Sequence, residues 1–362
     1  MANTTKVEDK YSVLVSNLST HFSWHKSRIK FLACVIIAIS KLHTVCFERL
    51  AEGFESNAIV ASRLRRIQRF FATFVVDNDL VAKFLFALLP QQKDLRISID
   101  RTNWQFGKTD INIFMLSVCY EGMALPLMWT MLEKRGNSNS LERIALIERF
   151  IRLFGKACIH DLVADREFIG DKWFRYLQKE RIPFHIRVRE NLWLTKINGE
   201  RLKISWVAQS RKINEVYHHP KLVYLDNTLV YISIIRLKRN EYLIVASYNN
   251  QESSIENYKD RWQIETMFKA FKTNGFNLED THLSEMERID KLVALVSIAF
   301  VWAYKVGLHV HLNEKPIPIK KHGRRAYSIF KYGIRVIKDA LLNSRDNQIL
   351  QINFISKLLS CT

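Results

Sequence analysis

The sequence predicts an α/β protein in which a mixed β-sheet, interrupted by a strand-rich insertion, is flanked by helical regions. Residues 1–90 carry apolar residues at helical spacing, whereas the segments from Leu95 onward show the spacing and length of strands. Strand signals continue through residues 184–248, and helical spacing returns from Ser254. Gly contributes only 11 and Pro only 6 of 362 residues, which excludes a loop-rich or collagen-like chain.

The N-terminal part, residues 1–90, is predicted to be a helical DNA-binding domain. Two short helices at residues 45–54 and 58–71 have the outline of a helix-turn-helix. The second is basic and carries the candidate DNA contacts Arg63 and Arg66. A solvated basic helix face is the alternative interpretation of the same pattern.

The sheet is predicted to begin after this helical part. Strands are expected at residues 95–100, 111–120, 123–132 and 158–164. Between the third and fourth strands, Asn139 and Glu142 have the spacing of a capping box that opens a helix ending at Phe154. Three strands joined by short turns, then a helix and a further strand, is the order of an RNase H-like mixed sheet.

A β-rich insertion domain is predicted at residues 184–253, between the two parts of the core at 91–183 and 254–312. Its strongest signal is Asn198-Gly199, a pair that suits a type I′ hairpin turn. The paired strands are expected at 193–197 and 200–206, and further strands at 222–224, 229–237 and 242–248.

Charge is the first indication of a partner. Lys and Arg number 55 and Asp and Glu 36, so the net charge is +19, which predicts a polyanionic partner, nucleic acid first and anionic membrane second. The basic helical C-terminal region, residues 313–362, carries the candidate phosphate contacts Lys320, Lys321, Arg324 and Arg325, and a solvated tail is the alternative. Because basic residues are spread along the chain, a membrane partner is not expected.

Cysteine usage and the start of the chain favour a cytoplasmic protein. The five cysteines are scattered, with none of the Cys/His spacings of a zinc site. The chain does not open with a signal peptide, and its longest apolar run in the N-terminal part has nine residues, where a membrane span needs about 20.

Three carboxylates are the candidate catalytic residues. Asp100 is expected at the end of the first strand and Asp165 directly after the fourth, two strands that are neighbours in an RNase H-like sheet. Glu265, on a helix packed at that edge, can reach the same point. Crowded carboxylates repel each other unless cations bind them, and Mg²⁺ takes oxygen ligands. Two such ions can activate an attacking hydroxyl and stabilise the leaving oxygen of a phosphodiester.

The helix that carries Glu265 also presents a set of polar side chains. At about 100° per residue, Tyr258, Arg261, Glu265 and Lys272 fall within about 60° of each other on one helix face. A solvated face with an Arg–Glu pair at i,i+4 spacing is the alternative.

These residues also match a known family. Asp100-Arg-Thr-Asn-Trp104, Asp165-Arg-Glu-Phe168 and a Y-x2-R-x3-E-x6-K pattern without mismatch resemble the bacterial insertion-sequence transposases of the DDE class. The subgroup that the chain resembles is often called insertion-sequence-four. The resemblance spans about residues 95–275 and keeps the order Asp, Asp, β insertion, Glu.

The resemblance implies cut-and-paste transposition, in which DNA is hydrolysed at the element ends and then joined to a target. It implies that Asp100, Asp165 and Glu265 hold two Mg²⁺ ions, for which Mn²⁺ can substitute. The implied partners are double-stranded terminal inverted repeats and target DNA, bound by a homodimer in a synaptic complex within the bacterial cytoplasm and nucleoid.

The resemblance also implies roles for other residues near the carboxylates. Arg261, Lys272 and Tyr258 would contact phosphates near the transposon end, which fits their donor groups. Relatives can cut the second strand through a DNA hairpin, with an aromatic residue holding a flipped base. Candidates for that residue are Trp104, Trp193 and Trp206, although a buried core position is the alternative for each.

Two other functions use the same features. An RNase H-like nuclease without strand transfer would have the same metal site, and only an assay for joining by a 3′-hydroxyl separates it from a transposase. A non-catalytic DNA-binding protein derived from a transposase should have lost carboxylates, whereas all three remain in this sequence.

Overall fold

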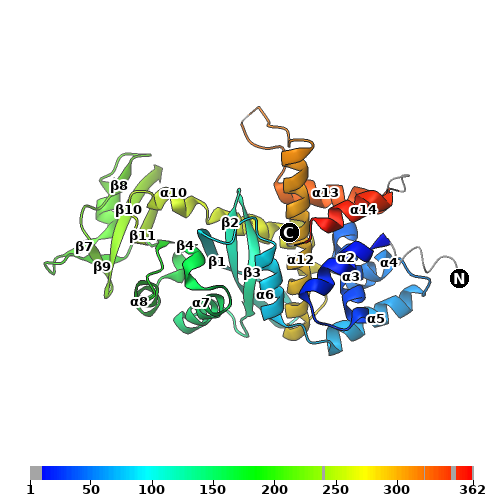
Figure 1. The fold of residues 1–362 in the computed structure, drawn as a ribbon. Coiled ribbons are helices and arrows are strands. Elements are labelled where there is room, and N and C mark those ends of the chain that lie inside the picture. The colour runs from blue at the N-terminus through cyan, green and yellow to red at the C-terminus, as the bar shows by residue number, and fades with distance from the viewer. Residues whose placement is uncertain (1–9, 239–240, 322, 344–347, 361–362) are drawn as a thin grey trace.

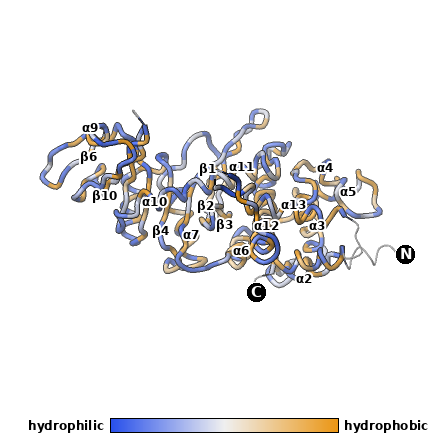
Figure 2. The backbone as a smooth tube through the Cα atoms, turned by 90° about the horizontal axis from the view of Figure 1, so that it is seen from above, coloured by the Kyte–Doolittle hydropathy of each residue, from blue (hydrophilic) through white to orange (hydrophobic). Residues whose placement is uncertain are grey.

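Three regions follow one another along the elongated molecule in the computed structural model (Figure 1). A bundle of helices lies at one end, a mixed β-sheet in the middle and a strand-rich block at the other end, and the view from above shows the same order (Figure 2). The structure describes residues 10–238, 241–321, 323–343 and 348–360. The predicted fold class, an α/β core with a strand-rich insertion and helical flanks, is confirmed.

The helical end combines helices from both ends of the described chain. The first group is α2 (Ser12–His21), α3 (Lys26–Leu42), α4 (Phe47–Gly53), α5 (Val60–Thr73) and α6 (Asn78–Ala87). The second group is α12 (Met286–Asn313), α13 (Ile329–Leu342) and α14 (Gln348–Lys357). The helix α3 is buried along most of its length because α2, α4, α12 and α13 all pack against it. At the start of α6, the Asp77 side chain accepts hydrogen bonds from two backbone N–H groups and caps the helix.

The C-terminal basic region is not a solvated tail. The helix α13 packs on α12 and α3, and α14 packs on α2. Asn17 of α2 donates a hydrogen bond of 2.8 Å to the Ser356 carbonyl of α14. The apolar positions of α13, among them Phe330, Ile334 and Ile337, are buried, so the packing of an apolar face decides the position of this segment.

The long helix α12 lies between the bundle and the sheet. It contacts α3 and α5 of the bundle, and also α6 and β3 (Met123–Met131), which contact each other. Asp290 accepts hydrogen bonds from Asn78 of α6 at 2.7 Å and from Trp129 of β3 at 2.5 Å. The helix is long and apolar enough to cross a membrane, but 83% of its most apolar stretch is buried inside the protein. Burial within the fold therefore accounts for its apolar character; α3 and α4 would meet the same criterion only as one span bent by 100°.

Two glycines allow α12 and α13 to approach closely. A Cβ atom on Gly333 would lie 1.8 Å from the Ala303 carbonyl oxygen and 2.5 Å from the Gly307 nitrogen. A Cβ on Gly307 would lie 2.1 Å from the Ile329 carbonyl oxygen. The backbones of these helices are therefore in direct contact, which no larger residue would permit.

The sheet is mixed, and its strands follow the predicted order. Its first five strands are β1 (Leu95–Phe106), β2 (Thr109–Tyr120), β3, β4 (Ile159–Ala164) and β5 (Phe184–Arg187). The pairs β1–β2 and β2–β3 are antiparallel, whereas β1–β4 and β4–β5 are parallel. The crossover from β3 contains α7 (Ser140–Phe154), and its predicted capping box between Asn139 and Glu142 is present. The strands β4 and β5 are joined through α8 (Asp171–Lys179).

The strand-rich block continues the same sheet. Its elements are β6 (Trp193–Thr195), β7 (Arg201–Lys203), α9 (Ile204–Gln209), β8 (Val216–His218), β9 (Val223–Leu225), β10 (Thr228–Lys238) and β11 (Glu241–Tyr248). Over the described residues the strand order is β3-β2-β1-β4-β5-β11-β10-β9-β6-β7, with β8 paired to β10. Because β11 pairs with β5, the ladder of hydrogen bonds runs from the block into the core without a gap.

Two details of the predicted hairpin in this block are wrong. The turn is not of type I′, because only Gly199 has a positive φ, of 84°, while Lys196 accepts a hydrogen bond from the Gly199 N–H. This is a three-residue loop that ends in a left-handed glycine. The second strand also stops at Lys203, and Trp206 lies on α9, whose buried residues Ile204 and Val207 have helical rather than strand spacing.

The helix expected to carry the Y-x2-R-x3-E-x6-K pattern is broken twice. It consists of α10 (Ser254–Lys259) and α11 (Trp262–Lys269), followed by a π-helical turn, η3 (Ala270–Asn274). The four residues therefore do not lie on one continuous α-helix face, since a break and a π-turn both change the helical phase. The remaining short elements are the 3₁₀ turns η1 (Lys156–Cys158), η2 (Arg166–Phe168) and η4 (Leu278–Asp280).

Candidate active site

The two aspartates are neighbours because β1 and β4 run parallel. The register pairs Ile99 with Ala164, and Asp100 and Asp165 are the next residues on their chains. Asp165 follows the last residue of β4 as predicted. Asp100 does not end its strand, because β1 continues to Phe106 in a long hairpin with β2. It lies instead where the parallel pairing with β4 ends, which is the point that brings it to Asp165.

The helices after the strand-rich block bring three further candidates to these aspartates. Tyr258, at the end of α10, is buried and donates its hydroxyl to Asp165 Oδ1 at 3.2 Å. Arg261 Nη1 lies 2.7 Å from Glu265 Oε1 and 3.9 Å from Asp100 Oδ2. One guanidinium thus connects a carboxylate on α11 with a carboxylate on β1. Pairwise contacts thus link Tyr258 with Asp165, and Arg261 with Glu265 and Asp100.

Burial and crowding shape the electrostatics of the cluster. Burial raises the pKa of Asp100 to about 7, and the neighbouring carboxylates of Glu167 and Asp165 add to the rise. The Arg101 N–H, which donates to Asp100 Oδ1 at 2.8 Å, and the Arg261 cation favour the ionised form but only partly offset the rise. Asp100 therefore carries a charge that the surrounding protein stabilises poorly.

The pKa values of Tyr258 and Arg261, which come from the helices, are both raised, but for different reasons. Burial raises the pKa of the Tyr258 hydroxyl well above its ordinary value, so this group is a neutral donor to Asp165. Burial alone would lower the pKa of Arg261, but Tyr258, Asp165 and Glu265 together raise it. Arg261 is 3% exposed and remains a permanent cation.

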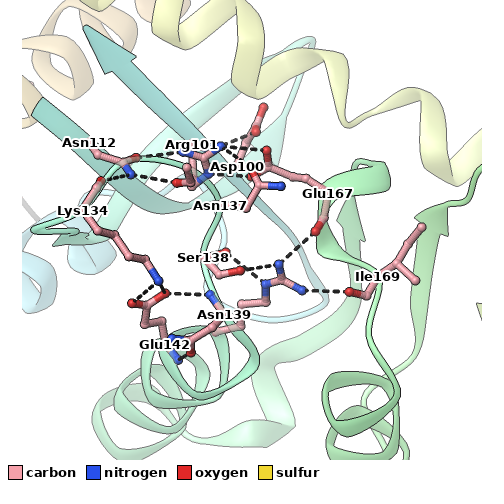
Figure 3. A network of polar contacts seen from close by, with 12 residues as sticks. Asp100, Arg101, Asn112, Lys134, Asn137, Ser138, Asn139, Glu142, Glu167 and Ile169 are labelled. Atoms are coloured by element: carbon pink, nitrogen blue, oxygen red, sulfur yellow. Dashed lines mark hydrogen bonds and ion pairs between the residues drawn. The ribbon is translucent and has the colours of Figure 1, made fainter. Parts of the chain in front are cut away.

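An ion pair next to the aspartates links the segment that begins at Asp100 to the segment that begins at Asp165 (Figure 3). Arg101 donates from Nε to Glu167 Oε1 at 2.8 Å and from Nη2 to Glu167 Oε2 at 3.0 Å. The same guanidinium donates to Asn112 of β2 and to Asn137. Since Arg101 follows Asp100 and Glu167 is two residues after Asp165, this bidentate pair fixes the spacing of the two aspartates.

A second arginine supports the loop that carries Glu167. Arg143 of α7 is buried and donates to the backbone carbonyls of Ser138, Glu167 and Ile169. Its guanidinium lies 5.0 Å from the centre of the Phe168 ring. Burial lowers the pKa of Arg143 to about 10, which still leaves it charged at neutral pH. The turn after Asp165 is thus held from two sides (Figure 3).

Lys272 does not join the carboxylates. Its Nζ pairs with Glu279 Oε1 at 2.7 Å, donates to the Asn103 carbonyl at 2.9 Å and lies 5.7 Å from the centre of the Trp104 ring. The π-turn η3 redirects this side chain toward the end of β1. Trp104 is half-buried, and its indole N–H has no acceptor among the described residues.

The remaining predicted residues lie in three other places. Trp193 and Trp206 are exposed in the strand-rich block, where their rings are 5.3 Å apart at 80°. The Arg63 guanidinium is already bound within the protein, because it donates to backbone carbonyls at the end of α4 and just beyond it. Arg66 is exposed and lies 4.9 Å from the Phe31 ring centre. The basic loop after α12 exposes Lys320, Lys321, Arg324 and Arg325.

The donor set of the cluster suits a hard divalent cation. Asp100, Asp165 and Glu265 offer carboxylate oxygens, the ligands that Mg²⁺ prefers, and the poorly stabilised charge of Asp100 favours a cation. Over the residues that the structure describes, no three His, Cys, Asp or Glu side chains are grouped closely enough to hold a metal ion. Arg261 instead bridges Glu265 and Asp100. The three residues thus fit the cation by their chemistry.

Sequence reasoning missed several residues of the cluster. Arg101 and Glu167 stand inside the two motifs that contain the aspartates, so their opposite charges were a signal that could have been used. Arg187, at the end of β5, lies 4.0 Å from Asp165 Oδ1. No local pattern marks it, because its position depends on the pairing of β5 with β4.

The fold and the site together define a class of protein. The mixed sheet, with Asp100 and Asp165 where the parallel pairing of β1 and β4 ends and a helix with Glu265 after the insertion, has the order of an RNase H-like core. The sequence model of the family described as "Transposase DDE domain" matches residues 91–302. The match covers more than half of the chain, which therefore belongs to this family of DDE transposases. Its members act on DNA and generally use divalent metal ions. No curated protein matches the sequence.

Proposed function

We propose that the protein is a cut-and-paste transposase of the insertion-sequence-four subgroup. The observation that carries this proposal is that Tyr258 contacts Asp165 and that Arg261 contacts both Asp100 and Glu265. Three members of the subgroup's four-residue signature thus lie at the carboxylates of the DDE domain. An unrelated surface ion pair would not bury Arg261 to 3% exposure.

The carboxylates of Asp100, Asp165 and Glu265 would hold two Mg²⁺ ions, with Mn²⁺ as a substitute. When bound, such ions supply an activated hydroxyl for attack on the phosphodiester and stabilise the leaving oxygen. The chain's own residues bind and orient the DNA. The donors of Arg261 and Tyr258 serve Glu265 and Asp165 in this structure, and they would turn to a phosphate once cations hold these carboxylates.

Contacts with the DNA outside the active site are proposed at the helical end. Arg65 and Arg69 of α5 and Arg288 of α12 line one groove of about 580 Å³ together with Glu48 and His282. Cations that converge in a groove suit the phosphates of a duplex. Arg65 and Arg69, which are exposed, are better placed for DNA than Arg63, whose donors are used within the protein.

A hairpin intermediate is part of the proposal. Trp193 and Trp206 are 40% and 56% exposed and form a pair of rings beside Arg201, which lies 4.9 Å from the Trp193 ring centre. Exposed rings next to a cation suit a base removed from the stack. Trp104 is the alternative, because it lies beside the signature residue Lys272.

The proposed domain organisation keeps a DNA-binding domain at 1–90, a catalytic core at 91–183 and 254–312, an insertion at 184–253 and a basic helical region at 313–362. The strand β5 pairs with β4 and β11 and thus joins core and insertion. A homodimer in the synaptic complex, terminal inverted repeats and target DNA as partners, and a cytoplasmic, nucleoid-associated location complete the proposal.

The test uses duplexes that carry the terminal repeats flanking the element's coding region. The full-length protein is incubated with these duplexes, a target plasmid and Mg²⁺, and nicked, hairpin and joined products are separated. The variants Asp100→Asn, Asp165→Asn and Glu265→Gln should each abolish cleavage while DNA binding persists, since each removes a charged oxygen ligand at constant size.

A matched control removes a carboxylate elsewhere. Asp226→Asn lies in an exposed turn with φ of 54°, a conformation that Asn adopts readily, and should cleave like the wild type. Near-normal cleavage by one of the three site variants would remove that residue from the site. Cleavage without joined products would refute strand transfer and leave a nuclease.

A further inference from the structure

The break between α10 and α11 lies next to the proposed active site and has a defined hydrogen-bond pattern. The backbone there changes to i→i+3 hydrogen bonds: the Arg261 N–H donates to Tyr258 at 3.1 Å, and the Gln263 N–H to Asp260 at 3.0 Å. This tighter turning sets the direction of α11 relative to α10. Tyr258 lies just before the break, Arg261 within it and Glu265 just after it, so the shape of the break decides where all three point.

A half-buried arginine of the sheet contacts this break. Arg96 of β1 donates from Nε and Nη2 to the two carboxylate oxygens of Asp161, both at 2.8 Å, and from Nη1 to Asp260 Oδ2 at 2.5 Å. Asp161 is 2% exposed. Burial alone would lower the pKa of Arg96, but the two carboxylates raise it. The planar fork of Arg96 therefore ties the sheet to the helix break.

Arg96 and Asp161 lie further back along β1 and β4 than the proposed catalytic aspartates. Arg96 precedes Asp100 by four residues on β1, and Asp161 precedes Asp165 by four residues on β4, so both pairs lie on one face of the sheet. The register pairs Arg96 directly with Asp161. Arg96 and Asp161 thus form a pair behind Asp100 and Asp165, and Arg96 of this rear pair binds Asp260.

A second contact supports the same region from β5. His185, fully buried, places Nε2 3.5 Å from Asp161 Oδ2 and 3.1 Å from Asn257 Nδ2 of α10. Hydrogen bonds from His185 and Arg96 hold the pKa of Asp161 below its usual range, although burial opposes this shift. Asp161 is therefore linked to the break through Arg96 and Asp260, and to β5 through His185.

We propose that Arg96 and Asp260 are positioning residues, which hold the helix break so that Tyr258 and Arg261 face Asp100 and Asp165. Neither residue touches DNA in this role. The consequence for cleavage rests on the proposed function, whereas the consequence for the rigidity of the break does not.

The test removes the hydrogen bond between Arg96 and Asp260. Asp260→Ala leaves Arg96 paired with Asp161, and Asp260→Asn keeps the size and an acceptor but removes the charge. Asp260 accepts from two side chains, Arg96 and Gln263. Asp79→Ala is the matched control, because Asp79 of α6 likewise accepts from two side chains, Arg149 at 2.6 Å and Arg152 at 3.0 Å. Its side chain is 28% exposed, against 38% for Asp260.

Three quantities are measured on the full-length proteins: single-turnover cleavage of the terminal-repeat duplex with Mg²⁺, the Kd for that duplex without metal, and amide hydrogen exchange over residues 258–264. For Asp260→Ala, cleavage should slow about 10- to 100-fold, as is typical when a supporting residue of a site is lost. The Kd should stay unchanged, and the amides of Arg261, Gln263 and Ile264 should exchange faster. Asp260→Asn should lie between Asp260→Ala and the wild type, and Asp79→Ala should match the wild type.

The outcomes separate this inference from the proposed function. Unchanged exchange over the break in Asp260→Ala overturns the inference, whatever happens to cleavage. Faster exchange with cleavage equal to that of Asp79→Ala overturns it as well. If the wild type itself cleaves no duplex, the proposed function fails, and the exchange result alone then decides whether Arg96 and Asp260 hold the break.

Discussion

Replacing Asp100 by Asn is expected to stabilise the metal-free protein at alkaline pH while it abolishes cleavage. The half-buried carboxylate lies near the negative charges of Glu167 and Asp165, and the cation Arg261 compensates them only in part. The amide keeps the size of the side chain and removes the charge. The residue proposed to hold metal would thus reduce the stability of the empty protein.

The size of the effect follows from the two pKa values. Asp titrates near 3.8 in its ordinary environment and at about 7 in the folded protein. Because the folded pKa is the higher one, the stability that proton binding gives to the native state is complete below about pH 4 and is lost as the pH rises through about 7. About three pH units at about 1.4 kcal/mol each give an upper limit near 4 kcal/mol.

Thermal unfolding in the presence of a chelator measures this effect. The Tm of Asp100→Asn should exceed that of the wild type by several degrees at about pH 8 and by much less at about pH 5. The control Asp226→Asn should show the same small difference at both values, since that side chain is exposed. An Asp100→Asn difference that is equal at both pH values would refute the reasoning. Added Mg²⁺ should raise the Tm of the wild type but not that of the variant.

Two further predictions concern DNA affinity and helix packing. Because the chain carries a net charge of +19, its affinity for duplex DNA should fall steeply between about 50 and about 200 mM salt, and a flat titration would contradict phosphate-dominated binding. Gly333→Ala should lower the free energy of unfolding by about 1–3 kcal/mol or more, because its Cβ would overlap the backbone of α12. Denaturant unfolding measures this loss, and Gly170→Ala, whose Cβ would have its nearest neighbour at 3.4 Å, should leave the midpoint nearly unchanged.

Local patterns were enough to predict the part of the site that lies on the sheet. The strand ending at Ala164 and the capping box of Asn139 depend on neighbouring residues, and both occur as expected. The long hairpin of β1 and β2 was underestimated, because residues 101–106 are more polar and more exposed than the start of the strand. The approach of Asp100 to Asp165 followed from the expected strand order, even though the strand boundary was wrong.

The residues that depend on distant partners could not be predicted. The break at Asp260 is held by Arg96, which is 164 positions away in the sequence. The π-turn that moves Lys272 toward Trp104 leaves no mark in the hydrophobic period of the helix. Trp206 follows a clear hairpin signal, but the packing of Ile204 and Val207 places it on a helix.

The unbroken ladder between β5 and β11 has a mechanical consequence. Arg187, the last residue of β5, is paired with Val245 of β11 and lies 4.0 Å from Asp165. A force applied to the exposed tip with Trp193 and Trp206 is therefore carried by backbone hydrogen bonds to the strand next to Asp165. The tip cannot swing freely as a hinged arm would, because rotation about this line would have to break the β5–β11 hydrogen bonds.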